Sequence, residues 1–228
     1  MQWNKFDRYS AWIYNMYKNH IGNKILDIGG GVGTAISFYI NEERNILSTE
    51  LFDDNIKIMN ERFADFKNFK AINANIVHED LNQYGKFDTI IMINVLEHIK
   101  EDTFILQKLR NVLTDSGKII ICVPAIASLY CYMDKNVGHY RRYTKGELQE
   151  KAKLAGLNII EDKYMNLFGI IPYYIKGKLH KNKQGSFSTN TSTKEAKLYS
   201  LATNILEPLE KLIKPRIGIS EFIILSKQ

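Results

Sequence analysis

The sequence predicts an α/β fold with an open, mostly parallel β-sheet and helices on both faces of that sheet. Strand-like and helix-like segments alternate five times between residues 24 and 156. Residues 87–95, FDTIIMINV, form a nearly continuous apolar run, which is typical of a strand buried on both faces. Because parallel strands are joined by crossover helices, this alternation favours a parallel sheet.

The first half of the chain supplies the N-terminal helix and the first four strands. An amphipathic segment rich in Trp and Tyr predicts a helix within residues 1–20. Strands are expected at KILDIG, NILSTE, FKAINANI and FDTIIMINV. Helices are expected from Gly33 to about Asn41 and over residues 54–66.

The second half completes the sheet and adds an insertion. Residues 101–113 and 144–156 are expected to form helices on either side of a fifth strand, KIIICVP. Two further strand-like runs, LNIIEDKY and SEFIILSK, predict a Rossmann-like sheet of seven strands whose last strand is antiparallel. Residues 166–215, between those two runs, are expected to form a helical lid within a single domain spanning residues 1–228.

Composition narrows the class of protein. No segment reaches the ~20 apolar residues that a membrane-spanning helix requires, and the N-terminal MQWNKFDRYS lacks the apolar core of a signal peptide. Cys122 and Cys131 have neither metal-ligand spacing nor the pattern of a disulfide framework. We therefore expect a soluble cytoplasmic protein.

The charge is unevenly distributed. Residues 1–128 carry 14 Lys and Arg against 16 Asp and Glu, whereas residues 129–228 carry 17 against 9. The basic second half suggests an anionic substrate, although a solvated basic surface explains each lysine equally well. No Arg-rich run or nucleic-acid motif accompanies the charge, so nucleic acid is not favoured. The stretch LFGIIPYYIKGKLHKNK is expected to belong to the lid, with weak membrane-surface contact as the alternative.

A glycine-rich stretch, ILDIGGGVGTA, contains the first predicted strand and the turn after it. It places Asp27, Gly29, Gly31 and Gly33 at alternate positions. Glycines here let the main chain approach a ligand at the carboxyl ends of the strands. The spacing departs from the dinucleotide pattern G-x-G-x-x-G, because Thr34 stands where the third glycine would be. The carboxylate of Asp27 would attract a cationic ligand and repel a pyrophosphate.

The segment LDIGGGVG resembles motif I of the class I S-adenosylmethionine-dependent methyltransferases, whose cofactor carries a sulfonium and no phosphate. INVLEHIKED and GHYRRYTKGEL resemble the stretches after the fourth and fifth strands in a bacterial, type 11/12-like subgroup that acts on small molecules or natural products. The resemblance covers residues 20–165, and NLFGIIPYY and ISEFIILSK also fit that subgroup. It implies S-adenosyl-L-methionine as cofactor and S-adenosyl-L-homocysteine as product.

The resemblance also implies the cofactor-binding residues. Glu50 stands where the family has an acidic residue that binds both ribose hydroxyls, and Asn75 stands where it has Asp or Asn facing the adenine amino group. Taken alone, an acid at a strand end or an Asn in a turn fits a structural role as well. The expected cofactor-binding residues are Asp27, Gly29, Gly30, Gly31, Gly33, Glu50, Leu51, Asn75, Ile76, Asn94 and Val95.

Methyl transfer from a sulfonium is an in-line displacement, so the protein must align the acceptor and exclude water. A base is needed for a hydroxyl acceptor but not for a carboxylate. The candidate catalytic residues are His98 and His139. We favour His139, in the segment that covers the active site in this fold, over the alternative of a loop histidine bonded to backbone. No metal site is expected, because the INVLEH segment offers only the carboxylate of Glu97.

The candidate substrate-binding residues are Tyr140, Arg141, Arg142, Tyr143 and Tyr9. An arginine here could hold a substrate carboxylate or phosphate in two-point contact. A surface salt bridge is the alternative for either arginine, and core packing is the alternative for the tyrosine of the N-terminal helix.

These observations predict metal-independent O-methylation of a hydroxyl or carboxylate group on a small molecule, saccharide or peptide, in natural-product or surface-glycan biosynthesis. The basic second half keeps an RNA or other nucleic-acid methyltransferase as the alternative. An NAD-dependent oxidoreductase or an inactive nucleoside-binding module is less favoured. The sequence leaves open the identity of the acceptor, the choice between oxygen and nitrogen, and the oligomeric state.

Overall fold

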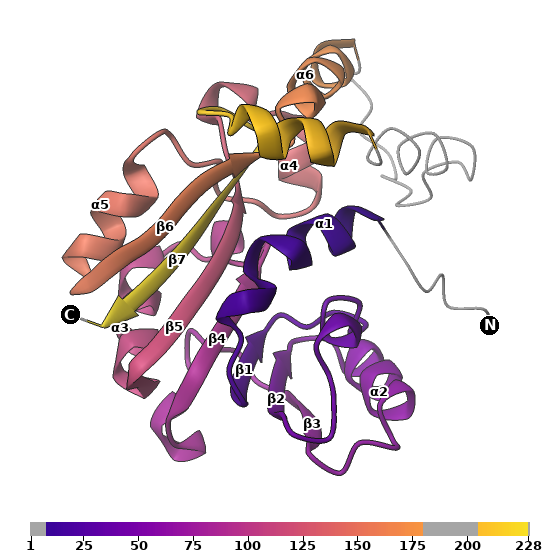
Figure 1. Ribbon diagram of the computed structural model, residues 1–228, viewed down its shortest axis with the longest axis vertical. Helices are drawn as coiled ribbons and strands as arrows, with labels where there is room; N and C mark the ends of the chain where they lie inside the picture. The colour runs from indigo at the N-terminus through magenta and orange to yellow at the C-terminus, as the bar shows by residue number, and fades with distance from the viewer. Residues whose placement is uncertain (1–7, 180–204, 228) are drawn as a thin grey trace.

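The computed structural model describes residues 8–179 and 205–227. Its strands are β1 (Lys24–Ile28), β2 (Asn45–Glu50), β3 (Phe69–Asn73), β4 (Phe87–Ile93), β5 (Leu113–Pro124), β6 (Leu157–Met165) and β7 (Ser220–Lys227). They form one sheet in the order β3-β2-β1-β4-β5-β7-β6 (Figure 1). β7 is antiparallel to both of its neighbours, and the other pairs are parallel. The predicted seven-stranded sheet with an antiparallel last strand is confirmed.

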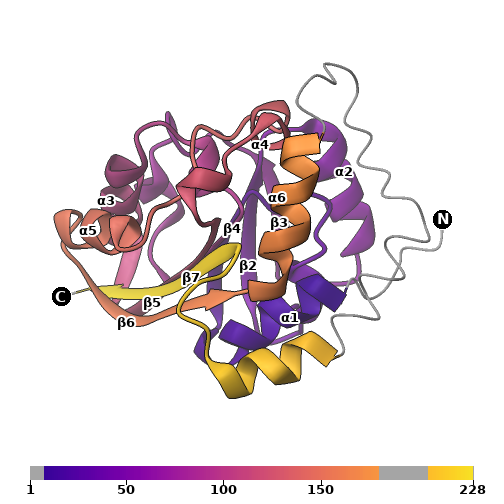
Figure 2. The ribbon, with the colours of Figure 1, turned by 90° about the horizontal axis from the view of Figure 1, so that it is seen from above.

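Helices cover both faces of the sheet (Figure 2). They are α1 (Arg8–Tyr17), α2 (Asp53–Arg62), α3 (Asp102–Val112), α4 (Tyr132–Asn136), α5 (Glu147–Leu154) and α6 (Ile170–Leu179), with a further helix over residues 205–213. Short 3-10 segments are η1 (Lys18–His20), η2 (Ile36–Phe38), η3 (Leu81–Tyr84), η4 (Leu96–His98), η5 (Ala127–Leu129) and η6 (Leu167–Gly169). Residues 1–7 of the predicted N-terminal helix lie outside the described residues.

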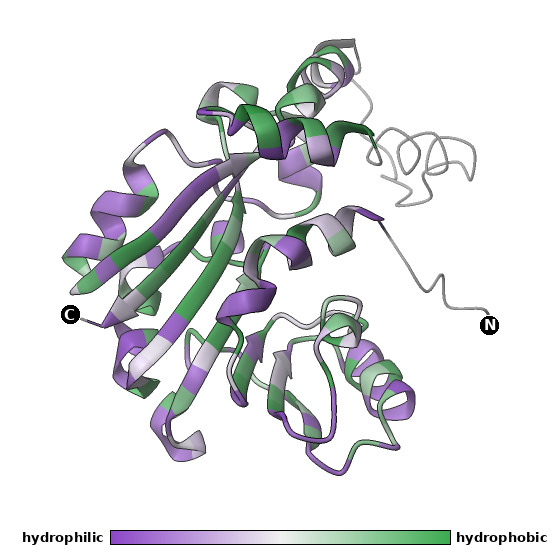
Figure 3. Ribbon diagram, viewed as in Figure 1, coloured by the Kyte–Doolittle hydropathy of each residue, from purple (hydrophilic) through white to green (hydrophobic). Residues whose placement is uncertain are grey.

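Two apolar cores, one on each face, hold the layers together. α3 and α5 pack in one core, and α1 and α2 pack in the other. Side chains along β5 alternate between the two cores. Ile119 and Ile121 pack in the first core, whereas Ile120 and Cys122 pack in the second. The central strands are therefore apolar on both faces, as the hydropathy colouring of β5 and β7 shows (Figure 3).

The segment after the glycine turn differs from its predicted structure. Instead of a helix running to about Asn41, it forms only the 3-10 turn η2. The hydroxyl of Ser37 donates to the backbone oxygen of Thr34 (2.7 Å), and the hydroxyl of Tyr39 donates to the carboxylate of Asp27 (2.6 Å). The first of these hydrogen bonds is local and competes with continued helix formation. The second turns Tyr39 back to a residue 12 positions earlier in the chain.

α4, α6 and the helix over residues 205–213 lie at the end of the sheet where the parallel strands finish (Figure 1). The carboxylate of Glu210 accepts hydrogen bonds from the backbone nitrogens of Asn166 (2.7 Å) and Leu167 (2.6 Å). These bonds connect the helix over residues 205–213 to the end of β6. Residues 180–204 of the predicted lid lie outside the described residues. Among the described helices, none has the length and hydropathy needed to cross a bilayer.

Candidate active site

The glycine turn after β1 adopts backbone conformations that suit glycine. Gly29, Gly31 and Gly33 have φ angles of 70°, 55° and 78°. A Cβ atom on Gly29 would lie 2.5 Å from a methyl carbon of Val95, just after β4. The turn also folds back on β2, because the backbone nitrogens of Gly29 and Gly30 both donate to the oxygen of Thr49. The main chain at the carboxyl end of β1 is thus held in place, and its glycines carry no side chain that would cover it.

Asp27 is buried beneath this turn. Its carboxylate accepts hydrogen bonds from the hydroxyls of Tyr39 (2.6 Å) and Ser48 (3.0 Å). Burial raises the pKa of Asp27 to about 6, although both hydrogen bonds oppose the rise. A Cβ on Gly30 would lie 2.2 Å from the Ser48 hydroxyl oxygen and 2.7 Å from Asp27, so these side chains occupy the space below the turn.

A cavity of about 410 Å³ lies at the carboxyl ends of β1, β2 and β4. Seven of the predicted cofactor-binding residues line it: Gly29, Glu50, Leu51, Asn75, Ile76, Asn94 and Val95. The other four, Asp27, Gly30, Gly31 and Gly33, are not among its lining residues. A larger cavity of about 690 Å³, between α1, β6 and the helix over residues 205–213, is lined by none of the predicted site residues.

Glu50, at the end of β2, links the glycine turn to the segment that follows its own strand. One carboxylate oxygen accepts from the backbone nitrogen of Gly31 (2.8 Å), and the other accepts from those of Leu51 (2.8 Å) and Phe52 (3.2 Å). The oxygen that accepts only from Gly31 keeps one lone pair, so a hydroxyl group of a ligand can still bind there. The resulting position on the cavity wall suits recognition of a ribose.

Two asparagines mark the other walls of the cavity. The side-chain oxygen of Asn75 accepts from the backbone nitrogen of Val77 (3.0 Å), which directs the amide group to the turn after β3. Asn94 directly follows β4 in a left-handed conformation, with φ 55°. Such a conformation is uncommon outside glycine and is often found in functional sites.

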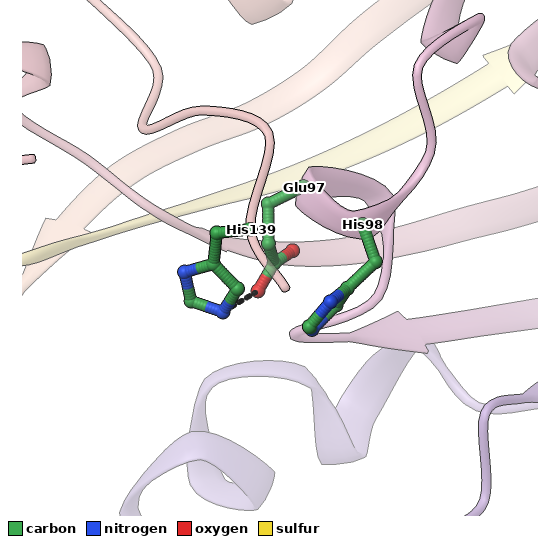
Figure 4. A group of neighbouring side chains, drawn as sticks. All are labelled: Glu97, His98 and His139. Atoms are coloured by element: carbon green, nitrogen blue, oxygen red, sulfur yellow. Dashed lines mark ion pairs between the residues drawn. The ribbon is translucent and has the colours of Figure 1, made fainter. Parts of the chain in front are cut away.

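Next to this cavity the fold brings together three polar groups from two separate segments: Glu97, His98 and His139 (Figure 4). His98 lines the cavity, and its ring lies 4.6 Å from the ring of His139. The side chain of Glu97 is fully buried, and Nε2 of His139 lies 3.7 Å from its nearer oxygen. Burial raises the pKa of Glu97 to about 8, and burial together with His139 lowers the pKa of His98.

Asp134, on α4, fixes the orientation of His139. Its carboxylate accepts from Nδ1 of His139 (3.0 Å), Nε of Arg142 (2.8 Å) and the hydroxyl of Tyr173 (2.9 Å). Although burial opposes ionisation, the hydrogen bonds from His139 and Arg142 hold the pKa of Asp134 well below its usual range. An ionised carboxylate can only accept, so Nδ1 of His139 carries the hydrogen, and in the neutral ring Nε2 presents a lone pair.

The predicted substrate-binding arginines are engaged in internal ion pairs. Arg141 pairs with Asp102, which also accepts from Lys151 (3.0 Å) and Tyr143 (3.0 Å). Arg142 is buried against Asp134. These charges are compensated within the protein, so they provide no support for an anionic substrate.

The two remaining substrate candidates lie apart from one another. Tyr140 is 59% exposed, and its backbone nitrogen donates to the backbone oxygen of Glu97 (2.9 Å), so it lies beside the histidines. Tyr9, on α1, lies near the last strand, with its hydroxyl 3.2 Å from that of Ser220.

Sequence reasoning did not select three residues of this site. Glu97 entered only as a solitary carboxylate, and Asp134 and Tyr173 were not considered. A signal for Glu97 was present in its position next to His98. Nothing in the sequence pairs Asp134 with Tyr173, which is far along the chain, and only the packing of α6 against the end of the sheet brings them together.

Residues 26–119, which span most of β1 to β5, match a family model described as a methyltransferase domain. A sequence search of the curated proteins found no significant match. The match covers the glycine turn and the residues that line the cavity after β2, β3 and β4. The segment that matches the family model therefore contains most of the cavity lining.

Solved structures share the fold across most of the chain. A S-adenosylmethionine-dependent methyltransferase from Clostridium acetobutylicum is 13% identical, with a TM-score of 0.60 over 100% of this chain and 92% of that chain. Coclaurine N-methyltransferase, solved with N-methylheliamine and SAH, is 11% identical, with a TM-score of 0.64 over 99% and 75%. The [4+2]-cyclase SpnF is 14% identical, with a TM-score of 0.63 over 97% and 81%.

At these identities the likeness establishes the fold, and the inclusion of a cyclase shows that one fold serves several chemistries. The assignment of activity comes from the family match together with the sequence motifs. The matched residues include the glycine turn, the acidic end of β2 and most of the lining of the cavity between them. Residues 26–119 thus match a methyltransferase domain, and the fold around them is that of solved S-adenosylmethionine-dependent methyltransferases.

Proposed function

We propose that this protein transfers the methyl group of S-adenosylmethionine to an oxygen atom of a small-molecule, saccharide or peptide acceptor. The observation that supports an oxygen acceptor best is the group formed by Glu97, His98 and His139 at the edge of the cofactor cavity. A carboxylate and an imidazole nitrogen with a free lone pair can both interact with the hydrogen of an acceptor hydroxyl.

Within this proposal the cofactor occupies the cavity at the ends of β1, β2 and β4. Glu50 binds the ribose hydroxyls, Asn75 and Ile76 contact the adenine, and Gly29 with Asn94 flanks the amino-acid end and the methyl group. Asp27 acts indirectly, because its hydrogen bonds to Tyr39 and Ser48 shape the turn from below. The acceptor enters beside Tyr140, which is the exposed residue next to the histidines.

The test uses S-adenosylmethionine with a deuterated methyl group and a panel of hydroxyl, carboxylate and amine acceptors, together with an RNA transcript. We expect a product that gains one labelled methyl group, with the label on oxygen by NMR. Glu50→Ala, purified in the same way, should lose the product because the cofactor no longer binds. Labelled methyl groups found on nitrogen or on RNA, and absent from every oxygen acceptor, would contradict the proposal.

A further inference from the structure

Glu97, His98 and His139 converge in space although they come from different parts of the chain. Glu97 and His98 belong to η4, directly after β4, whereas His139 follows α4. Each residue offers one potential ligand atom, and these three atoms all lie within 4.8 Å of one another. Figure 4 shows the three side chains directed towards a common point. Two imidazoles and a carboxylate are ligand types of first-row transition metals.

The carboxylate of Glu97 lacks a hydrogen-bond partner within the described residues. Its side chain has no exposed surface, and neither of its oxygen atoms forms a hydrogen bond. Nε2 of His139 lies 3.7 Å from one of these oxygens, which is beyond hydrogen-bonding distance. A buried carboxylate without a partner costs considerable free energy, and such groups are rare without a function or a bound ion. A cation between the three residues would give this carboxylate a partner.

Both imidazoles are oriented in the way that metal-binding histidines usually are. Nδ1 of His139 lies 3.0 Å from the carboxylate of Asp134, and Nδ1 of His98 lies 3.3 Å from the backbone oxygen of Gly138. Because these oxygens accept hydrogen bonds, each Nδ1 carries the hydrogen and each Nε2 presents a lone pair. Metal-ligating histidines characteristically make such a second hydrogen bond to a carboxylate or a backbone carbonyl.

We propose that Glu97, His98 and His139 bind a divalent first-row transition-metal ion, in place of the metal-independent reaction that the sequence favoured. Two nitrogen ligands and one oxygen ligand suit zinc, iron, cobalt or manganese better than magnesium or calcium, which prefer all-oxygen sites. Three protein ligands leave coordination positions open for another molecule. His98 lines the cofactor cavity, so these open positions lie beside the expected methyl group.

The role of the ion rests on the proposed O-methylation. A hydroxyl oxygen of the acceptor binds at an open position, where the positive charge favours loss of the hydroxyl proton to solvent. The oxygen then forms a bond to the methyl carbon, and the bond between that carbon and the sulfonium sulfur breaks. Its electron pair stays on sulfur, which becomes the neutral thioether of S-adenosylhomocysteine.

The test measures metal binding separately from activity. The full chain is dialysed against a chelator and titrated with Co²⁺, which is followed by its visible absorption bands and by calorimetry. We expect saturable binding of one ion per chain. His98→Ala and His139→Ala should each weaken Co²⁺ binding about 100-fold or more, because each removes a ligand. His78→Ala, at an exposed histidine outside the cluster, should bind Co²⁺ as the unaltered protein does.

The substitutions at His98 and Glu97 should leave the protein folded, so a loss of Co²⁺ binding reports on the ligands. The side chain of His98 is partly exposed, so its replacement should leave the circular dichroism spectrum unchanged. Glu97→Gln keeps the shape of the buried side chain, and it should weaken Co²⁺ binding to a similar degree. Undiminished Co²⁺ affinity in His98→Ala, or no stoichiometric binding by the unaltered protein, would overturn the metal site.

Two results separate this inference from the proposed function. Full methyl transfer by protein that has been dialysed against the chelator would show that the reaction does not need the ion. The O-methyltransferase proposal would then remain intact. Stoichiometric Co²⁺ binding, combined with methyl transfer to nitrogen alone, would uphold the metal site and contradict the oxygen acceptor.

Discussion

Asp27 and Glu50 are acidic residues of the same motif region, and their positions in the strands give them different roles. Asp27 lies within β1, so its side chain points into the core formed with α1 and α2, where Tyr39 and Ser48 bind it. Glu50 is the last residue of β2, so its carboxylate reaches the backbone of the glycine turn and the cavity. We therefore expect Glu50 to contact the cofactor directly and Asp27 to act only by shaping the turn.

A third acid, Glu221 on β7, makes stability depend on pH. It is fully buried, and burial, followed by the charge of the neighbouring Asp162, raises its pKa to about 8. The folded protein therefore keeps a proton that the unfolded chain releases near pH 4.5. The free energy of unfolding should fall as pH rises from about 4.5 to about 8, by a few kcal/mol.

The pH dependence can be checked by urea unfolding at pH 5, 7 and 9. Glu221→Gln cannot ionise, so its free energy of unfolding should change less across this range than that of the unaltered protein. Glu61→Gln, at an exposed position on α2, is the matched control and should retain the full dependence. A dependence that persists unchanged in Glu221→Gln would assign it to another group.

At the scale of elements, the glycine turn is held between its neighbours. Val95 lies against Gly29 from β4, Ser48 lies below Gly30 from β2, and Phe63 lies against Gly33 from the end of α2. By contrast, a Cβ atom on Gly31 would meet no atom within 4 Å, so only its left-handed backbone favours glycine there. The packing of three elements, and not the turn alone, determines its shape.

This difference predicts unequal effects of two similar substitutions. Gly31→Ala should cost about 1 kcal/mol of stability, from backbone strain alone. Gly30→Ala should cost about 2 kcal/mol and should weaken binding of S-adenosylhomocysteine more strongly, because the new methyl group collides with Ser48. Chemical unfolding and calorimetric titration measure both quantities.

A double-mutant cycle identifies the contact responsible. Removing the hydroxyl oxygen by Ser48→Ala should recover at least ~0.5 kcal/mol of the loss caused by Gly30→Ala. Recovery should be incomplete, because Asp27 remains 2.7 Å from the added carbon. Strictly additive effects of the two substitutions would show that the contact is not the cause.

At the scale of the whole molecule, the cofactor cavity is formed by residues from the ends of several strands. Glu50 follows one strand, Asn75 the next and Asn94 another, and they meet because β1 lies between β2 and β4 in the sheet. Ligand binding should therefore stabilise the sheet as a unit. NAD carries a pyrophosphate in place of the sulfur-bearing amino-acid end, so it should not bind here.

Thermal unfolding tests this expectation. S-adenosylhomocysteine at about 100 times its dissociation constant should add ~2.7 kcal/mol of stability. For a chain of this size, that corresponds to a rise in melting temperature of roughly 5–10 °C. NAD at the same concentration should produce no rise, and Glu50→Ala should reduce the rise with S-adenosylhomocysteine. Equal stabilisation by both ligands would contradict the assigned cavity.

The fold and most of the cofactor cavity could be predicted from the sequence because they depend on local patterns. Strand–helix alternation predicts the parallel sheet, and apolar runs such as residues 87–95 identify the strands buried on both faces. Seven predicted cofactor-binding residues line one cavity because strand ends in a parallel sheet necessarily meet at one edge. The helix expected after Gly33 was wrong, because Tyr39 turns back to Asp27 through a contact that local propensity does not encode.

The sequence by itself determined the fold class and the segments that contain the candidate site residues. Only the tertiary structure decided how those residues are used. It buries Glu97 beside two imidazoles, uses Asp134 to orient His139, and engages Arg141 and Arg142 in internal ion pairs. The physical reason is that hydrogen bonds and ion pairs depend on distance in space, whereas the sequence reports only distance along the chain.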